Sequence, residues 1–339
     1  MQKLRQKVHY ERIVCMEKEI KKIGVLTSGG DAPGMNAAIR AVVRCGIYNG
    51  IKVYGVKKGY NGLINGDIDY MSARSVGEIL QKGGTILQTA RCLEFKEPEG
   101  VKKAVEQAKA VGLDGLVVIG GDGSFRGARD LCRMGLPTIA MPGTIDNDIT
   151  CSEYTIGYDT CLNTVISAVD KLRDTSSSHE RCSVVEVMGR HAGYIAVEAG
   201  IACGAELVLI PEFEFDFERD VINVIKKGIK RGKKHCIVIV AEGIGGAEAM
   251  ARRIEEETGM ESRATILGHI QRGGSPTIRD RVIASMMGAK AVELLLDGKQ
   301  NRIICMQNGK VTDVDIEEGL AMQKELSPEL MGLIKKLSV

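Results

Sequence analysis

The feature that most constrains the fold of this 339-residue chain is a unit that recurs along it: a short apolar run, a glycine-rich turn and a helix-like stretch. Residues 23–26 begin one such unit, with a helix predicted over 35–48, and residues 115–119 begin another, with a helix ending near Met134. Similar apolar runs occur at 138–141, 183–187, 206–210, 236–241 and 264–267. Continuous apolar runs separated by helices are typical of parallel strands that are covered on both faces. The sequence therefore predicts a doubly wound α/β architecture.

Composition excludes several classes of protein. A net charge of +2, with 44% apolar and 27% charged residues, excludes a disordered polyelectrolyte and argues against a dedicated nucleic-acid binder. No window approaches the roughly 18 apolar residues of a membrane helix, and the N-terminus lacks the apolar core of a signal peptide. The ten cysteines are scattered without a C-x-x-C pair, which indicates thiols in a reducing compartment rather than zinc ligands or disulfides. We therefore expect a cytoplasmic protein.

Two glycine-rich turns, at 29–30 and 120–121, are candidates for binding phosphate. Both follow predicted strands, where helix N-termini present free backbone N–H groups, and glycine has no Cβ to hold a phosphate oxygen away. Asp122 could supply a carboxylate to Mg²⁺. The alternative is a pair of tight turns with a capping Asp. Neither turn matches the P-loop or the G-x-G-x-x-G fingerprint, which disfavours ordinary P-loop ATPases and Rossmann dehydrogenases.

The turn after residues 138–141 carries two carboxylates, Asp146 and Asp148. In an extended segment, side chains at i and i+2 point to the same side, so one Asp could take the proton of an attacking hydroxyl while the other orients it. The alternative is an Asx-rich turn that bonds to its own backbone. Arg190 and Arg272 stand beside glycines, which favours a role in binding phosphate.

Five segments form an ordered set: TSGGDAPGMNAAIR at 27–40, GGDGS at 120–124, PGTIDND at 142–148, MGRHAGYIA at 188–196 and GHIQRGGSP at 268–276. Together they resemble the ATP-dependent 6-phosphofructokinases of the bacterial type. The spacing is similar from about Lys22 to near the C-terminus, apart from one extra residue between Phe213 and Arg219. GGDGS also resembles a turn of lipid and NAD kinases, whereas PGTIDND and GHIQRGGSP are not expected in those families.

The resemblance implies the phosphofructokinase fold, with two Rossmann-like three-layer domains and mainly parallel sheets. An ATP-binding domain would comprise residues 22–157 and 271–322, and a fructose 6-phosphate domain residues 158–270 and 323–339. Residues 1–21 precede the match as an N-terminal extension, and we expect either a disordered leader or a native start at Met16.

The implied reaction transfers the γ-phosphate of MgATP to the 1-hydroxyl of fructose 6-phosphate. Asp146 would be the general base, with Thr144, Asp148 and Arg190 assisting. The implied ATP-binding residues are Gly30, Arg91, Cys92, Gly121, Asp122, Gly123 and Ser124, with Mg²⁺ at Asp122. The implied substrate-binding residues are Thr144, Ile145, Asp146, Arg181, Met188, Gly189, Arg190, Glu242, Arg263, His269, Ile270, Gln271 and Arg272. Arg181 and Arg263 match positions that this family supplies across a subunit interface, so a homotetramer is implied.

The phosphoryl donor depends on Gly123 and Gly143, because pyrophosphate-dependent relatives typically carry Asp and Lys at these positions. Two glycines therefore favour ATP. A pyrophosphate-dependent enzyme and a GGDG-type kinase acting on NAD or a lipid remain alternatives. A non-catalytic nucleotide sensor is a third alternative, although Asp122, Asp146 and Arg190 are all present.

The resemblance also implies regulation, with ADP as activator and phosphoenolpyruvate as inhibitor in one pocket between subunits. The matching positions are Arg40, Ala41, Val42, Val43, Arg44, Arg173, Gly204, Ala205, Glu206, Arg231, Lys233, Lys234 and His235. The alternative for Arg40 and Arg44 is a solvated basic helix face. From the residues alone, we expect 174–181 to be a loop.

Overall fold

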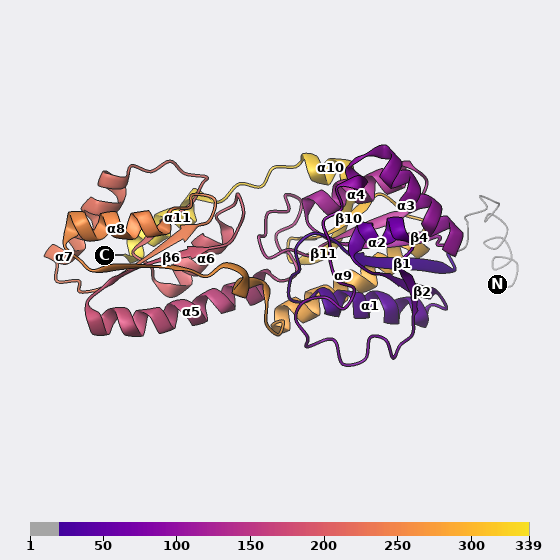
Figure 1. The fold of residues 1–339 in the computed structure, drawn as a ribbon, viewed down its shortest axis with the longest axis horizontal. Helices are drawn as coiled ribbons and strands as arrows, with labels where there is room; N and C mark the ends of the chain where they lie inside the picture. The colour runs from indigo at the N-terminus through magenta and orange to yellow at the C-terminus, as the bar shows by residue number, and fades with distance from the viewer. Residues whose placement is uncertain (1–19, 339) are drawn as a thin grey trace, which may run out of the picture.

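The protein is described here by a computed structural model that covers residues 20–338. The expectations about the leader, including a start at Met16, fall almost wholly outside the described residues. Two lobes, each built around a sheet, lie side by side along the long axis of the molecule (Figure 1). The predicted α/β architecture is confirmed. Seven of the eleven strands among residues 20–338 lie near predicted positions, and the other four were not predicted.

The larger lobe contains a seven-stranded sheet in the order β11-β10-β5-β4-β1-β2-β3. Its strands are β1 (Lys22–Thr27), β2 (Lys52–Val56), β3 (Ile68–Met71), β4 (Gly115–Gly120), β5 (Thr138–Pro142), β10 (Arg302–Gln307) and β11 (Lys310–Asp315). Of these strands, β2, β3, β10 and β11 were not predicted. The central strands pair in parallel, whereas β3 and β11 pair antiparallel at the two edges. All six residues of β4 are buried, as expected for a strand covered on both faces.

Helices cover both faces of this sheet. One face packs against α1 (Met35–Tyr48) and α9 (Ile278–Leu296). The other face packs against α2 (Gly59–Asn65), α3 (Pro98–Val111), α4 (Asp122–Arg133) and α10 (Ile316–Ala321), with the short 3-10 helix η1 (Glu94–Lys96) nearby. The helix predicted over 35–48 is confirmed with the same bounds.

The smaller lobe contains a parallel four-stranded sheet in the order β7-β8-β6-β9. Its strands are β6 (Cys182–Val187), β7 (Leu207–Leu209), β8 (Cys236–Ala241) and β9 (Ser262–Ile266). One face packs against α5 (Tyr158–His179), α6 (Tyr194–Cys203) and α11 (Pro328–Leu337). The other packs against η2 (Phe217–Ile222), α7 (Asn223–Lys230) and α8 (Ala247–Thr258), and η3 (Gly268–Arg272) follows β9.

One local expectation is corrected, and the structure adds a detail at a second segment. Residues 174–179, expected as a loop, form the last turns of α5, where the hydroxyls of Ser177 and Ser178 bond to the Asp174 carbonyl within the helix. The segment with the extra residue leads directly into η2, which is a π-helix. A π-helical turn has i→i+5 hydrogen bonds and therefore holds more residues per turn than an α-helix.

The two sheets fall in the two lobes that the predicted domain division separates, and the division itself stays a prediction. The C-terminal segment crosses between the lobes from α10 to α11 (Figure 1). Among residues 20–338, no helix is long and apolar enough to cross a membrane.

Candidate active site

Three predicted site residues from separate segments line one cavity of about 270 Å³ between the lobes. Asp122 begins α4, Asp148 lies beyond β5, and Arg190 follows β6, and all three line this cavity. These positions lie beyond the carboxyl ends of their strands, where open α/β sheets bind ligands. The segments GGDGS, PGTIDND and MGRHAGYIA are therefore brought together by the fold.

The GGDGS turn lies at the N-terminus of α4, as expected. Gly120 requires the absence of a Cβ, since one placed there would lie 2.4 Å from the Ser28 carbonyl oxygen. A Cβ on Gly123 would meet no atom within 4 Å, so that position faces open space. Residues 29–30 lie in the loop between β1 and α1, five residues before the predicted helix start at Met35.

Asp146 is buried, with 7% of its surface exposed, and its Oδ1 atom has no hydrogen-bond partner. Its backbone N–H donates to Thr144 Oγ1 at 3.2 Å, and the Thr144 carbonyl accepts a bond from Thr155. Burial, with the nearby charge of Asp148, raises the pKa of Asp146 to about 6, although Arg272 opposes the shift. A buried carboxylate with one oxygen free of hydrogen bonds and a pKa of about 6 is suited to accept a proton near neutral pH.

The turn that carries these carboxylates is not the extended segment that the i, i+2 argument assumed. Asn147 adopts a left-handed conformation with φ of 52°, and Ile145 is fully buried in the core. Burial raises the pKa of Asp148, and the positive charge of Arg190 opposes that effect. The charge of Asp148 still raises the pKa of Asp146, so the folded turn rather than an extended segment brings the two carboxylates close.

Arg190 is exposed and also adopts a left-handed conformation, with φ of 59°. Glu242, at the end of β8, holds this conformation because its Oε1 atom accepts bonds from the backbone N–H groups of Gly189 (3.2 Å) and Arg190 (2.6 Å). Met188 is buried, and its N–H donates to Gln271 Oε1 at 3.2 Å. Backbone strain held by such bonds is typical of functional turns.

The GHIQRGGSP segment reaches back to the larger lobe. Arg272 Nη1 donates to the Asp31 carbonyl at 3.2 Å, and its guanidinium lies against Gly30, where a Cβ would come within 2.3 Å. Gln271 is fully buried and donates to the Gly268 carbonyl, so its side chain holds the segment in place. His269 and Ile270 are exposed.

Other predicted residues are not brought to this cavity within the chain. Arg181 precedes β6, and Arg263 lies at the start of β9, so both are at the amino ends of these strands. Both form ion pairs with Glu261, Arg181 at 2.8 Å and Arg263 at 2.5 Å. Arg190 lies at the opposite end of β6, roughly 20 Å away for a six-residue strand. Arg91 and Cys92 lie in the loop before η1, exposed and half-buried respectively.

The predicted effector residues divide into two groups. Arg173 on α5 donates to the carbonyls of Cys203 and Gly204, and Glu206 pairs with Lys233 at 3.6 Å, so residues 173, 204–206 and 231–235 are neighbours. Arg40 and Arg44 lie on α1 in the other lobe. The expectation is not supported for the side chains of Ala41, Val42 and Val43, which pack in the core with at most 9% of their surface exposed.

Two residues near the site belong to no motif and were not predicted from the sequence. Lys324, between α10 and α11, donates to the carbonyls of Asn147 and Ser152. Asp280, near the start of α9, is fully buried and accepts bonds from Tyr154, Gly157 and Thr160. Both lie outside the five matching segments, and only the fold reveals their contacts.

The carboxylates of this cavity fit a hard cation such as Mg²⁺. Asp122 and Asp148 both line it, and the charge of Asp122 raises the pKa of Asp148. Mg²⁺ typically binds one or two carboxylates together with phosphate oxygens. Among the described residues, no group of three or more His, Cys, Asp or Glu side chains could hold a metal alone.

The sequence is similar to that of a known protein family and its members. The sequence profile of the phosphofructokinase family matches residues 22–295. The chain is 57% identical over 319 residues to an ATP-dependent 6-phosphofructokinase of Clostridium botulinum strain Hall, covering 94% of this chain and all of that one. It is also 57% identical over 320 residues to an ATP-dependent 6-phosphofructokinase of Bacillus cytotoxicus, with the same coverage.

Solved structures give the same fold. A phosphofructokinase structure from Saccharomyces cerevisiae superposes with a TM-score of 0.84 at 34% identity, covering 94% of this chain and 48% of that chain. A pyrophosphate-dependent phosphofructokinase from Marinobacter aquaeolei superposes with a TM-score of 0.83 over 94% of this chain and 91% of that one. Its 21% identity indicates a shared fold only.

Proposed function

This chain belongs to the phosphofructokinase family and is an ATP-dependent 6-phosphofructokinase, and we propose that Asp146 is the general base of its reaction. Asp146 takes the proton from the 1-hydroxyl of fructose 6-phosphate, the hydroxyl oxygen attacks the γ-phosphorus of ATP, and ADP leaves. The observation that carries this proposal is the buried Oδ1 atom of Asp146, which has no partner within the described residues. Its pKa of about 6 leaves it mostly ionised at neutral pH.

The neighbouring residues have matching roles in this proposal. Arg190 stabilises negative charge on the transferring phosphoryl group, and Glu242 fixes its backbone through two N–H bonds. Asp122 and Asp148 would hold Mg²⁺, which would supply positive charge to the nucleotide phosphates. Arg272 binds the phosphate of the sugar, where Gly30 leaves room for its guanidinium.

Asp146→Asn tests the general base. The proposal expects kcat to fall by about 10²- to 10⁴-fold, with little change in ATP binding, because the amide cannot take the proton. A kcat close to that of the unsubstituted enzyme would remove Asp146 from this role.

Gly123→Asp tests whether ATP is the phosphoryl donor. A carboxylate fits here without disturbing the fold because the position faces open space, yet it would repel the ATP phosphates. We expect the KM for ATP to rise by about tenfold or more, with an unchanged unfolding midpoint. A preference of the unsubstituted enzyme for pyrophosphate would contradict the assignment of ATP.

We propose in addition a homotetramer in the cytoplasm with an effector site for ADP and phosphoenolpyruvate. Arg181 and Arg263 lie at the wrong ends of their strands to reach Arg190 in the same chain, which supports their donation to a neighbouring subunit. The cluster of Arg173, Gly204, Glu206 and Lys233 supports the effector site. Phosphoenolpyruvate should make the fructose 6-phosphate curve more sigmoidal, and Arg173→Ala should abolish this response.

A further inference from the structure

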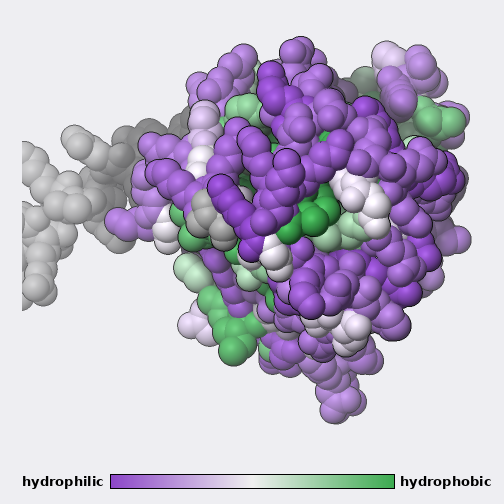
Figure 2. Space-filling view, turned by 90° about the vertical axis from the view of Figure 1, so that its left-hand side faces the viewer, coloured by the Kyte–Doolittle hydropathy of each residue, from purple (hydrophilic) through white to green (hydrophobic). Residues whose placement is uncertain are grey.

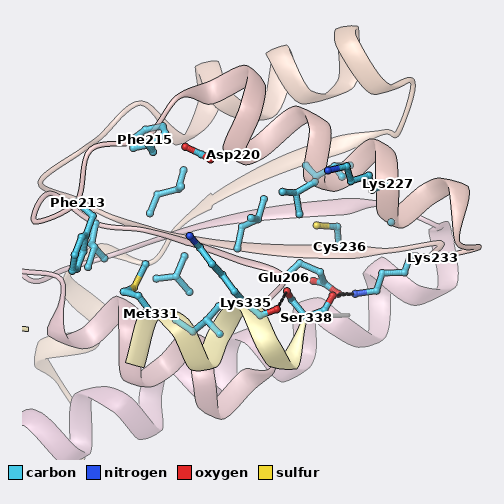
Figure 3. A pocket seen from close by; sticks show the side chains of 18 of the residues that line it. Glu206, Phe213, Phe215, Asp220, Lys227, Lys233, Cys236, Met331, Lys335 and Ser338 are labelled. Atoms are coloured by element: carbon cyan, nitrogen blue, oxygen red, sulfur yellow. Dashed lines mark hydrogen bonds and ion pairs between the residues drawn. The ribbon is translucent and has the colours of Figure 1, made fainter. Parts of the chain in front are cut away.

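The smaller lobe contains a second, larger cavity of about 690 Å³ that the proposed reaction does not use. It lies along the outer edge of β7, the last strand of its sheet, between the segment η2–α7 and helix α11 (Figure 3). This end of the molecule is mainly hydrophilic, with hydrophobic residues visible in a hollow at its surface (Figure 2). A cavity of this size falls in the range that holds small ligands.

The walls of the cavity are predominantly apolar. They include Phe215 and Val224 on the side of η2 and α7, and Phe213, Met331 and Ile334 on the α11 side. Two glycines, Gly228 and Gly332, widen it, and a Cβ on Gly332 would meet no atom within 4 Å. Such walls favour a hydrocarbon chain, because burial of apolar surface drives its binding.

Cationic side chains accompany this apolar space. Lys227, Arg231 and Lys335 all line the cavity, and none of them has an ion-pair partner within 4 Å among residues 20–338. The carboxylates of Glu214 and Asp220 also line it, and the pKa of Asp220 is lowered by the hydrogen bond from Arg219 and, to a smaller extent, by the charge of Lys335. Figure 3 shows the Lys335 side chain extending from α11 into the space between the walls. Lys233 differs, because it already contacts Glu206 at 3.6 Å and the Ser338 carbonyl at 2.7 Å.

We propose that this cavity binds a medium-chain acyl carboxylate, with the chain between α7 and α11 and the carboxylate at Lys335. The apolar walls and the cationic side chains together fit an amphiphilic anion. The apolar walls do not suit a strongly hydrated polyphosphate. Four residues predicted for the effector site, Glu206, Arg231, Lys233 and His235, also line this cavity. The proposal concerns the binding of the acyl carboxylate alone, and its tests measure that binding rather than an effector response.

A tryptophan reporter measures this binding directly. The chain contains no Trp, so Phe215→Trp places the only indole on the cavity wall. Sodium decanoate, kept below its micelle concentration, should change the emission of the full-length reporter protein with a saturable dependence. Calorimetry on the unsubstituted chain should give a similar Kd, which shows that the indole did not create the site. Lack of saturable binding in both measurements would overturn the proposal.

Two substitutions then locate the ligand. Gly332→Leu fills the cavity and favours the helix, so we expect a folded protein whose affinity for decanoate falls by about tenfold or more. Lys335→Met should weaken decanoate by about tenfold and leave the affinity for uncharged decanol unchanged. The exposed Lys336 does not line the cavity, so Lys336→Met is the matched control with unchanged affinity. Equal affinity in Gly332→Leu, or equal affinity of the unsubstituted chain for decanol and decanoate, would refute the assignment.

Discussion

The Lys324 ammonium group lies 2.7 Å from the carbonyl oxygen of Asn147 and 2.9 Å from that of Ser152, so one side chain joins both ends of the turn that follows the proposed base. It also lies 4.6 Å from the ring centroid of Tyr194, at the start of α6 in the smaller lobe. A cation in this position ties the carboxylate turn to the lobe that carries Arg190.

Lys324→Met should therefore lower kcat by about 10- to 100-fold, because two charge-assisted bonds to the turn are lost. Burial lowers the pKa of Lys324 to about 8, so the ammonium loses its charge as the pH rises through 8. We expect kcat of the unsubstituted enzyme to decline over that range. Arginine stays protonated, so Lys324→Arg should retain activity and lose the alkaline decline in a pH profile of kcat.

The matched control is Lys336→Met, which removes an exposed lysine far from the turn in sequence and should leave kcat unchanged. An alkaline decline that persists in Lys324→Arg would show that another group titrates. That result would contradict the role given to Lys324.

The interaction between Asp146 and Asp148 predicts how kcat/KM depends on pH below neutrality. Burial raises the folded-state pKa of Asp146 to about 6, and a base must be ionised, so kcat/KM should fall as the pH drops through 6. Asp148→Asn removes a like charge that contributes to this shift. Its acid limb should therefore move to lower pH, even though its activity at neutral pH is reduced. A limb at the same or higher pH would argue against the electrostatic coupling.

Much of the fold could be predicted because continuous apolar runs such as those in β4 and β8 are buried on both faces. Four strands were missed. The edge strands β3 and β11 lack that signal, because most of their residues are exposed or half-exposed, and both pair antiparallel. The interior strands β2 and β10 were missed as well, although residues 303–306 of β10 are buried. Residues 174–179 looked like a loop because Ser and Asp compete with helical bonding in isolation. In the fold, packing of α5 against the smaller sheet outweighs that preference.

The site could be predicted only where glycine-rich segments marked it. Asp122, Asp146 and Arg190 lie in such segments, and the structure places Asp122 and Arg190 at one cavity with Asp148. Lys324 could not be found this way, because its partners are backbone carbonyls more than 170 residues away in the sequence. The separation of Arg181 from Arg190 likewise depends on strand direction rather than on any motif.

The contact between Gly30 and Arg272 predicts a loss of substrate affinity without a loss of stability. A Cβ at residue 30 would lie 2.3 Å from Arg272 Nη1, which is the mobile end of a long side chain. Gly30→Ala should displace the guanidinium and raise the KM for fructose 6-phosphate by about tenfold, since a bidentate phosphate contact depends on its position. Steady-state kinetics check the KM and thermal unfolding checks the fold. An unchanged KM would mean that Arg272 does not bind the sugar phosphate from this position.

We expect Asp280 to contribute strongly to the stability of the junction between the two lobes. Its Oδ1 accepts bonds from the Tyr154 hydroxyl at 2.6 Å and the Gly157 N–H at 2.8 Å, and Oδ2 accepts from the N–H of Thr160 at 2.9 Å. Asp280→Ala leaves these buried donors unpaired and should lower the free energy of unfolding by about 3–5 kcal/mol. Asp280→Asn should lower the free energy of unfolding by less, because its amide oxygen can still accept from Tyr154 and Gly157.

The control is Asp297→Ala, at the exposed end of the same helix. It should change the free energy of unfolding by under about 0.5 kcal/mol in denaturant titrations. Equal effects of Asp280→Ala and Asp297→Ala would show that the buried carboxylate contributes no more than a surface residue.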